Sequence, residues 1–288
     1  MPKLLFTGKK LLTEFGETLN KISKELYDFY IEMLENDYID LEHRDNKVGF
    51  AITNYLSESS LPVITGNFKG DYLELKILSH EFGHAFQKYN ASLEDKKYIV
   101  SPLLKYPTFE IAEMFSYAME IICMRHADNL FDTKDYNKYC FMKFYNLVSM
   151  MPYMCLVDEF QEVIYTNKKL EKADIRKIWL ELSSKYGFDK NNEGHKNLES
   201  GGYFYRQSHI ILNPFYYIDY ALSHFGAFAI SDGCKNNLDM FKTVGKEASY
   251  YPFKELVKKY NMSDPFNEMS VKKVSKMLES ELLKYKLK

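Results

Sequence analysis

Apolar residues recur at helical spacing along most of the chain. Near its start they stand three and four positions apart, which predicts one long amphipathic helix over residues 12–33. This stripe could form a coiled coil, but packing on the protein's own core is the simpler interpretation. Further helices are predicted at about residues 109–127, 133–150, 157–166, 170–186, 215–229, 253–260 and 267–285, with a Gly/Asn-rich loop at 190–202.

Two short stretches have the composition of strands instead. Residues 48–55 and 62–68 are rich in Val, Ile and aromatic residues, and a polar Ser-Glu-Ser-Ser turn at 57–60 separates them. No internal repeat or linker interrupts the chain. The pattern predicts a mainly α protein with a small β-sheet beside its central helix, organised as a single domain over residues 1–288.

The central helix carries the strongest chemical signal, in the stretch LSHEFGHAFQKYN at residues 78–90. His80 and His84 stand four positions apart and share one helical face, so both imidazoles can bind one zinc ion. Glu81 is then placed to accept a proton from water at the metal. Asp71 and Glu74 are a helix start signal. The alternative is a core helix that carries two hydrogen-bonded histidines.

Composition narrows the classes of partner. The 288 residues are 46% hydrophobic and 27% charged with a net charge of −2, so neither nucleic acid nor an anionic membrane is an expected partner. No apolar run of the sequence approaches membrane-spanning length. The four cysteines form no C-x-x-C pair and no signal peptide is evident, which predicts a reducing, cytoplasmic location.

A zinc site needs a third protein ligand. The extended motif H-E-x-x-H-x-x-G-x-x-H is excluded, because Gln87 and Asn90 occupy its last two positions. A carboxylate from the helix at 109–127 is the remaining option, and Glu110, Glu113 and Glu120 all lie on one stripe of it. Such an acidic stripe could equally be a solvated face.

A second candidate cluster lies in residues 208–222, SHIILNPFYYIDYAL. Aromatic packing in the core would explain most tyrosines at this spacing. A functional interpretation is that imidazole and phenol groups donate hydrogen bonds to the oxyanion that forms during peptide hydrolysis. His209, Tyr217 and Tyr220 are the candidates, and Tyr216 could replace one of the tyrosines. His224 is a weaker candidate.

The motif HEFGHAFQ followed by YPTFEIAEMFSYAME at residues 106–120 resembles the oligoendopeptidase F branch of the thimet oligopeptidase-like zinc metallopeptidases. The resemblance implies that Glu113 is the third zinc ligand and that Ser116 and Glu120 orient the ligands. A similar H-x-x-x-x-P-F-Y-Y-I-D-Y segment in this branch implies that His209, Tyr217 and Tyr220 bind substrate and stabilise the tetrahedral intermediate.

The resemblance extends upstream to I-D-L-E-x-R-x-x-K at residues 39–47 and to the strand that ends in ITGNFKG at residues 64–70, where an edge strand is implied to hold the extended substrate. Full-length members are roughly twice as long, so we expect this chain to correspond to their catalytic half without the N-terminal region. We therefore expect self-association into a homo-oligomer, or a separate N-terminal subunit, with the helix at 12–33 as a contributor.

These observations predict a helical zinc-metallopeptidase catalytic domain of the H-E-x-x-H gluzincin type, with one Zn²⁺ per chain and an oligopeptide substrate. Zinc would bind His80, His84 and Glu113, and Glu81 would be the general base. His209, Tyr217 and Tyr220 would complete the catalytic set. The alternatives are a non-catalytic zinc-binding or scaffold protein, and a catalytic subunit that needs a separate N-terminal partner.

Overall fold

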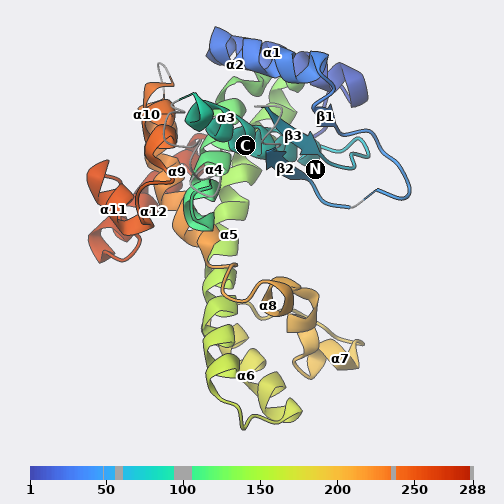
Figure 1. Cartoon of the computed structure of the whole chain (residues 1–288). Helices are drawn as coiled ribbons and strands as arrows, with labels where there is room; N and C mark the ends of the chain where they lie inside the picture. The colour runs from blue at the N-terminus through green and yellow to red at the C-terminus, as the bar shows by residue number, and fades with distance from the viewer. Residues whose placement is uncertain (48, 56–60, 94–105, 235–237, 286–288) are drawn as a thin grey trace. The chain divides into compact units, whose positions relative to one another are not determined.

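The computed structural model describes residues 1–47, 49–55, 61–93, 106–234 and 238–285 (Figure 1). By their internal contacts these form two compact units, Met1–Lys143 with Ser223–Lys288 (unit 1) and Phe144–Leu222 (unit 2). The predicted fold class is confirmed, since helices dominate and one three-stranded sheet accompanies them. The organisation as a single domain stays a prediction.

Unit 1 begins with two helices, where the sequence pattern predicted one. Helix α1 spans Gly8–Ile22 and α2 spans Lys24–Glu35. Ser23 separates them, and its hydroxyl accepts a hydrogen bond from the Glu25 amide as the N-cap of α2. The apolar stripe of both helices is buried in the core of unit 1, which confirms core packing and leaves that stripe unavailable to a partner chain.

The sheet of unit 1 has the order β1–β3–β2, with β1 at Ile39–Asp40, β2 at Ile52–Tyr55 and β3 at Pro62–Thr65. Strand β1 runs parallel to β3, and β2 runs antiparallel to it. The strand ending at residues 64–65 is therefore central, and within the described residues β1 and β2 form the edges. The predicted turn at 57–60 and Val48 lie outside the described residues.

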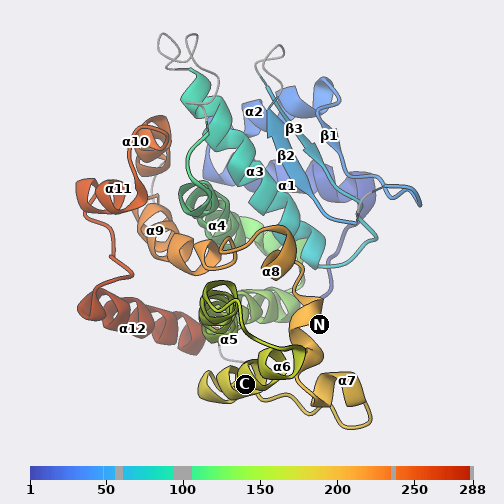
Figure 2. The same cartoon turned by 60° about the horizontal axis from the view of Figure 1, so that its bottom comes forward.

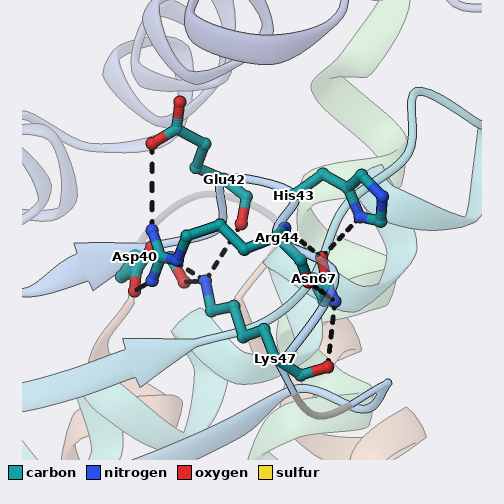
Figure 3. Close-up of polar contacts among 6 residues, drawn as sticks. All are labelled: Asp40, Glu42, His43, Arg44, Lys47 and Asn67. Carbon is teal, nitrogen blue, oxygen red and sulfur yellow. Dashed lines mark hydrogen bonds and ion pairs between the residues drawn. The ribbon is translucent and has the colours of Figure 1, made fainter.

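A polar network closes the loop that follows β1 (Figure 3). Lys47 Nζ donates to the carbonyl and carboxylate of Asp40 at 2.9 and 2.8 Å, and Arg44 pairs with the same carboxylate. The Asn67 amide, just beyond β3, donates to the carbonyl oxygens of Arg44 and Lys47 at 3.0 and 3.1 Å. The charged residues of the 39–47 motif thus close this loop on itself, and Asn67 fastens it to the chain segment that leads into α3.

Helix α3 (Leu73–Ser92) is the central helix of unit 1, in contact with β2, β3, α4 (Phe109–His126) and α10 (Asp239–Glu247) (Figure 2). Its predicted start is confirmed, because the Asp71 carboxylate accepts from the Leu73 amide at 2.7 Å and Glu74 accepts from Gly70. Phe82 and Phe86 on α3 are fully buried. Unit 1 also contains η2 (Ala127–Leu130), α11 (Phe253–Lys259) and α12 (Glu268–Lys284).

Helix α5 is continuous over Thr133–Thr166, where two helices were predicted on either side of Pro152. A proline inside a helix removes one backbone hydrogen bond and commonly kinks the helix, but here it does not end it. By length and composition α5 is the one helix within the described ranges that could cross a membrane. One such helix is weak evidence, because core helices of soluble proteins pass the same test.

Unit 2 contains the second part of α5, α6 (Lys172–Lys185), α7 (Lys196–Glu199), η3 (Gly202–Arg206) and α8 (His209–Leu212). Its core surrounds Trp179, whose ring lies edge-on to Phe160 at a centroid distance of 5.0 Å. The predicted loop at 190–202 contains α7. Helix α9 (Asp219–Gly233) begins in unit 2 and continues into unit 1.

Candidate metal centre

Two neighbouring helices of unit 1 bring three candidate metal ligands together. His80 and His84 lie one turn apart on α3, and Glu113 lies on α4. The Glu113 Oε2 atom is 3.2 Å from His80 Nε2 and 3.7 Å from His84 Nε2. One ligand atom from each residue lies within 4.8 Å of the others. The three residues singled out from the sequence therefore converge.

These distances fit a zinc ion. Bonds of about 2.0–2.2 Å in a tetrahedral arrangement place neighbouring ligand atoms about 3.4 Å apart, and the two observed distances lie on either side of that value. Two imidazole nitrogens and one carboxylate oxygen are also the donor set of catalytic zinc sites that leave a fourth position open. The residues present thus fit the metal in donor type and in the position of Glu113 relative to both histidines.

Gly83 allows α4 to approach α3 closely enough for this convergence. A Cβ atom at this position would lie 2.7 Å from Ser116 Cα and 2.8 Å from the Phe115 carbonyl oxygen. Both atoms belong to the backbone of α4, so they cannot move aside as a flexible side chain could. Gly83 therefore sets how closely the two helices pack, and this spacing brings Glu113 next to the two histidines.

A second layer of polar side chains orients the ligands. Glu120 Oε1 lies 2.6 Å from His80 Nδ1, and the Ser116 hydroxyl donates to Glu113 Oε2 at 2.9 Å. Lys143 on α5 forms a buried ion pair with Glu120. Glu113 and Glu120 are only 6% and 1% exposed, so a solvated acidic face is excluded for both of them.

Glu110, the third carboxylate of the stripe, does not take part in this group. It is partly exposed at the first turn of α4 and accepts a hydrogen bond from Thr108 at 2.8 Å. The choice among the three glutamates therefore agrees with the register that the family resemblance implied.

The charges of the group are strongly coupled. Burial alone would lower the pKa of His80, but the carboxylates of Glu113 and Glu120 raise it to about 10. Burial likewise opposes ionisation of Glu113, yet His80 lowers the pKa of that carboxyl to about 2. Burial lowers the pKa of His84 to about 3. Without a metal, an imidazolium at His80 thus faces a carboxylate at Glu113, while His84 is neutral.

The Glu81 side chain contacts the sheet, whereas His80 and His84 lie near the third ligand, Glu113. Its carboxylate Oε2 accepts a hydrogen bond of 2.6 Å from the Thr53 hydroxyl on β2, and the same hydroxyl lies 2.9 Å from the Glu81 carbonyl oxygen. Burial raises the pKa of Glu81, while the charge of His80 and the Thr53 hydrogen bond work in the opposite direction. A carboxylate with a raised pKa is suited to general base catalysis.

The second predicted cluster lies in unit 2. The His209 ring lies 5.8, 5.1 and 6.0 Å, between ring centroids, from Tyr216, Tyr217 and Tyr220. Tyr217 also belongs to the unit 2 core, as aromatic packing would predict, and the function of its hydroxyl stays a prediction. His224 lies in unit 1 instead, where its ring is 3.8 Å from that of Tyr117.

Three contacts at these sites were missed from the sequence. Thr53, Lys143 and Gln207 contact Glu81, Glu120 and His209, respectively, from distant or irregular segments. None of the three belongs to a spacing pattern or motif. Lys143 is the one unusual residue among them, because lysines are seldom buried. Its burial follows from tertiary packing and is not visible in the sequence.

The structure thus defines a mainly helical protein with a candidate metal-ligand set of two histidines and one glutamate. The model of peptidase family M3 matches residues 16–251, and the chain belongs to this family. Among curated protein sequences, none matches this chain.

The chain is also similar to solved structures of peptidases. A protein provisionally assigned as oligoendopeptidase F is 29% identical with a TM-score of 0.87, and the alignment covers 98% of this chain and 49% of that one. PZ peptidase A with an inhibitor is also 29% identical at a TM-score of 0.87, with 98% and 50% covered. A provisional oligoendopeptidase F from Bacillus anthracis str. Ames is 26% identical at 0.81, with 99% and 48% covered. The chain thus spans about half the length of these structures.

Proposed function

We propose that this protein is a zinc-dependent metalloendopeptidase that hydrolyses oligopeptides. The observation that carries the proposal is the convergence of His80, His84 and Glu113 on one point, beside a buried Glu81 held by a strand hydroxyl. Membership of peptidase family M3 supports the reaction class. The oligoendopeptidases among the similar structures support the class of substrate.

Zinc would be held by the two histidines of α3 and by Glu113 of α4. When bound, zinc polarises the scissile carbonyl and lowers the pKa of water. Glu120 accepts a hydrogen bond from His80 Nδ1–H and so presents the lone pair of Nε2 to the metal position. Ser116 restrains the Glu113 carboxylate in the same way.

Glu81 would act as the general base. Its carboxylate accepts a proton from the attacking water and then delivers that proton to the nitrogen of the leaving amine. The Thr53 hydrogen bond holds one carboxylate oxygen and leaves the other for this transfer. His209, Tyr217 and Tyr220 of unit 2 would stabilise the tetrahedral intermediate by donating hydrogen bonds to its oxyanion.

The metal assignment has a direct test in the zinc content of the purified chain. We expect about one zinc per chain in the wild type. Glu113→Ala should lose the metal, Glu120→Ala should weaken its binding by about 10–100-fold, and Glu110→Ala is the control that retains it. Equal zinc retention by Glu113→Ala and the wild type would show that Glu113 is not a ligand.

Activity is tested with a quenched fluorescent oligopeptide on the zinc-loaded chain, with and without a chelator. Glu81→Gln should retain zinc and lose turnover, because the amide cannot accept the proton. Zinc bound in full without any cleavage by the wild type would instead favour the non-catalytic zinc-binding alternative. Self-association or a separate partner that completes the substrate channel stays a prediction, which sedimentation at micromolar concentration would test.

A further inference from the structure

The His209 ring is held by a side chain from the segment just before it. Gln207 Nε2 lies 2.6 Å from His209 Nδ1. The other end of the same amide, Gln207 Oε1, accepts a hydrogen bond of 3.1 Å from the Tyr153 hydroxyl on α5. All three residues belong to unit 2, and Tyr153 is only 5% exposed.

The direction of these two hydrogen bonds determines the tautomer of the histidine. An amide nitrogen can only donate, so the Nδ1 atom that faces it must carry the lone pair. A neutral imidazole has one N–H, which is then on Nε2. With the Tyr153 O–H donating to Oε1, the NH₂ group of the amide faces His209.

The surroundings keep these groups in the protonation states that the arrangement requires. Burial lowers the pKa of His209, which favours the neutral ring at physiological pH. Burial raises the pKa of the Tyr153 phenol, so it remains a donor. The titratable groups that face the ring are Tyr216, Tyr217 and Tyr220, and burial raises the pKa of Tyr217 to about 12.

We propose that Tyr153 and Gln207 are positioning residues that hold His209 in its Nε2–H tautomer, so that Nε2–H is the group that donates to the carbonyl oxygen of the substrate. The inference rests on the proposed function, since it assigns His209 a carbonyl oxygen to bind. With the opposite tautomer, Nε2 would present a lone pair and would repel the developing oxyanion instead of stabilising it.

The tautomer can be read by ¹⁵N NMR on the zinc-loaded full chain labelled at its seven histidines. The His209 signal is identified by its absence from a His209→Asn sample. We expect an unprotonated Nδ1 and a protonated Nε2 in the wild type. Gln207→Glu replaces the donor with an acceptor of the same shape and should protonate Nδ1. Arg206→Gln changes the net charge equally at the neighbouring exposed residue and should leave the tautomer unchanged.

Kinetics give the second measurement. Gln207→Glu should lower kcat with little change in KM, by up to the roughly 10²–10³-fold expected for loss of one oxyanion donor. Tyr153→Phe should give a mixture of tautomers and a smaller loss, whereas Tyr205→Phe, at an exposed position of the same unit, should have no effect.

A wild-type spectrum with Nδ1 protonated would overturn the inference, as would a Gln207→Glu spectrum identical to the wild type. Because the NMR measurement needs no turnover, the two proposals can fail separately. The expected tautomers in a chain that cleaves no peptide would leave the positioning intact and remove the proposed function.

Discussion

At the scale of single residues, the site depends on which partner each carboxylate has. Glu81 and Glu113 are both buried and lie near the same histidines, but Glu81 is paired with a hydroxyl and Glu113 with an imidazole. The first arrangement leaves the pKa of Glu81 raised, and the second lowers that of Glu113 to about 2. The two side chains are thereby suited to different functions, proton transfer and metal binding.

Replacement of Thr53 by valine should move the pH profile of the proposed peptidase activity. The Thr53 hydroxyl stabilises the ionised form of Glu81, so Thr53→Val should raise the pKa of Glu81 further. A hydrogen bond to a charged group contributes about 1.5–3 kcal/mol, which corresponds to about one to two pKa units. We expect the acid limb of kcat/KM to move to higher pH while zinc content is unchanged.

Thr18→Val is the matched control for this change. Thr18 is also buried, and its hydroxyl donates to Asn129 Oδ1 at 3.0 Å in a part of unit 1 formed by α1 and η2. The pH profile should be that of the wild type. If Thr53→Val and Thr18→Val had the same acid limb, the strand hydroxyl would not influence the base.

At the scale of elements, the site is the contact between α3 and α4, supported by α5. Both histidines lie on α3, but the third ligand comes from α4, so the distance between the two helices decides whether a metal can bind. Lys143 of α5 then neutralises Glu120 behind the ligands. Burial alone would raise the pKa of Glu120, and Lys143 instead holds it well below the ordinary value.

Gly83→Ala should weaken zinc binding without changing any ligand. The added methyl group would meet the α4 backbone at 2.7–2.8 Å and force the two helices apart. We expect a loss of about 1–3 kcal/mol of stability, typical of overpacking, and a lower zinc affinity in a chelator competition. At Gly16 in α1 the nearest atom to an added Cβ is 3.4 Å away, so Gly16→Ala should retain both properties. Wild-type affinity in Gly83→Ala would contradict the close-approach argument.

Lys143→Met should destabilise the metal-free protein more than a typical substitution. It removes the ammonium partner of the buried Glu120 carboxylate and leaves the His80 ring as its ion-pair partner. Removal of one partner of a buried ion pair commonly costs about 3–5 kcal/mol. Zinc affinity should fall by about 10–100-fold because Glu120 orients His80. Denaturant unfolding and zinc titration measure the two effects.

The double variant Lys143→Met/Glu120→Gln is the control, because it removes both charges. It should be more stable than the single variant, and equal or lower stability would argue against the ion pair.

At the scale of the whole molecule, the proposed chemistry is divided between the two units. Unit 1 holds the metal group and the base, and unit 2 holds His209 and its tyrosines. A metal bound by His80, His84 and Glu113 would link α3 and α4 within unit 1, and its binding should stabilise that unit directly.

Zinc binding should release a proton and strengthen as pH rises. In the metal-free chain the carboxylates of Glu113 and Glu120 raise the pKa of His80 to about 10, and zinc must displace the proton on this ring. The apparent affinity should increase by about tenfold per pH unit between neutral pH and pH 10. Calorimetry in two buffers of different ionisation enthalpy counts the protons released at pH 7. Release of none would show that His80 is already neutral without the metal.

Local patterns in the sequence determined the helical character of the chain and one face of the site. The pairing of His80 with His84 depends only on helical periodicity, and the start of α3 depends on side chains within four residues of it. The two helix predictions that were wrong, for the first helix and for α5, also depended on single residues within those helices. Ser23 divides the first helix because a cap outweighs a continuous apolar stripe, and α5 passes through Pro152 although proline disfavours the helix interior.

Tertiary structure decided what depends on contacts between distant segments. Periodicity placed Glu110, Glu113 and Glu120 on one stripe, and only the approach of α4 to α3 at Gly83 brings Glu113 rather than Glu110 to the histidines. The parallel pairing of β1 with β3, the Thr53 contact to Glu81 and the Lys143 ion pair likewise join residues more than ten positions apart. Burial and proximity of this kind arise from the packing of whole elements, whereas helical periodicity is a property of each segment by itself.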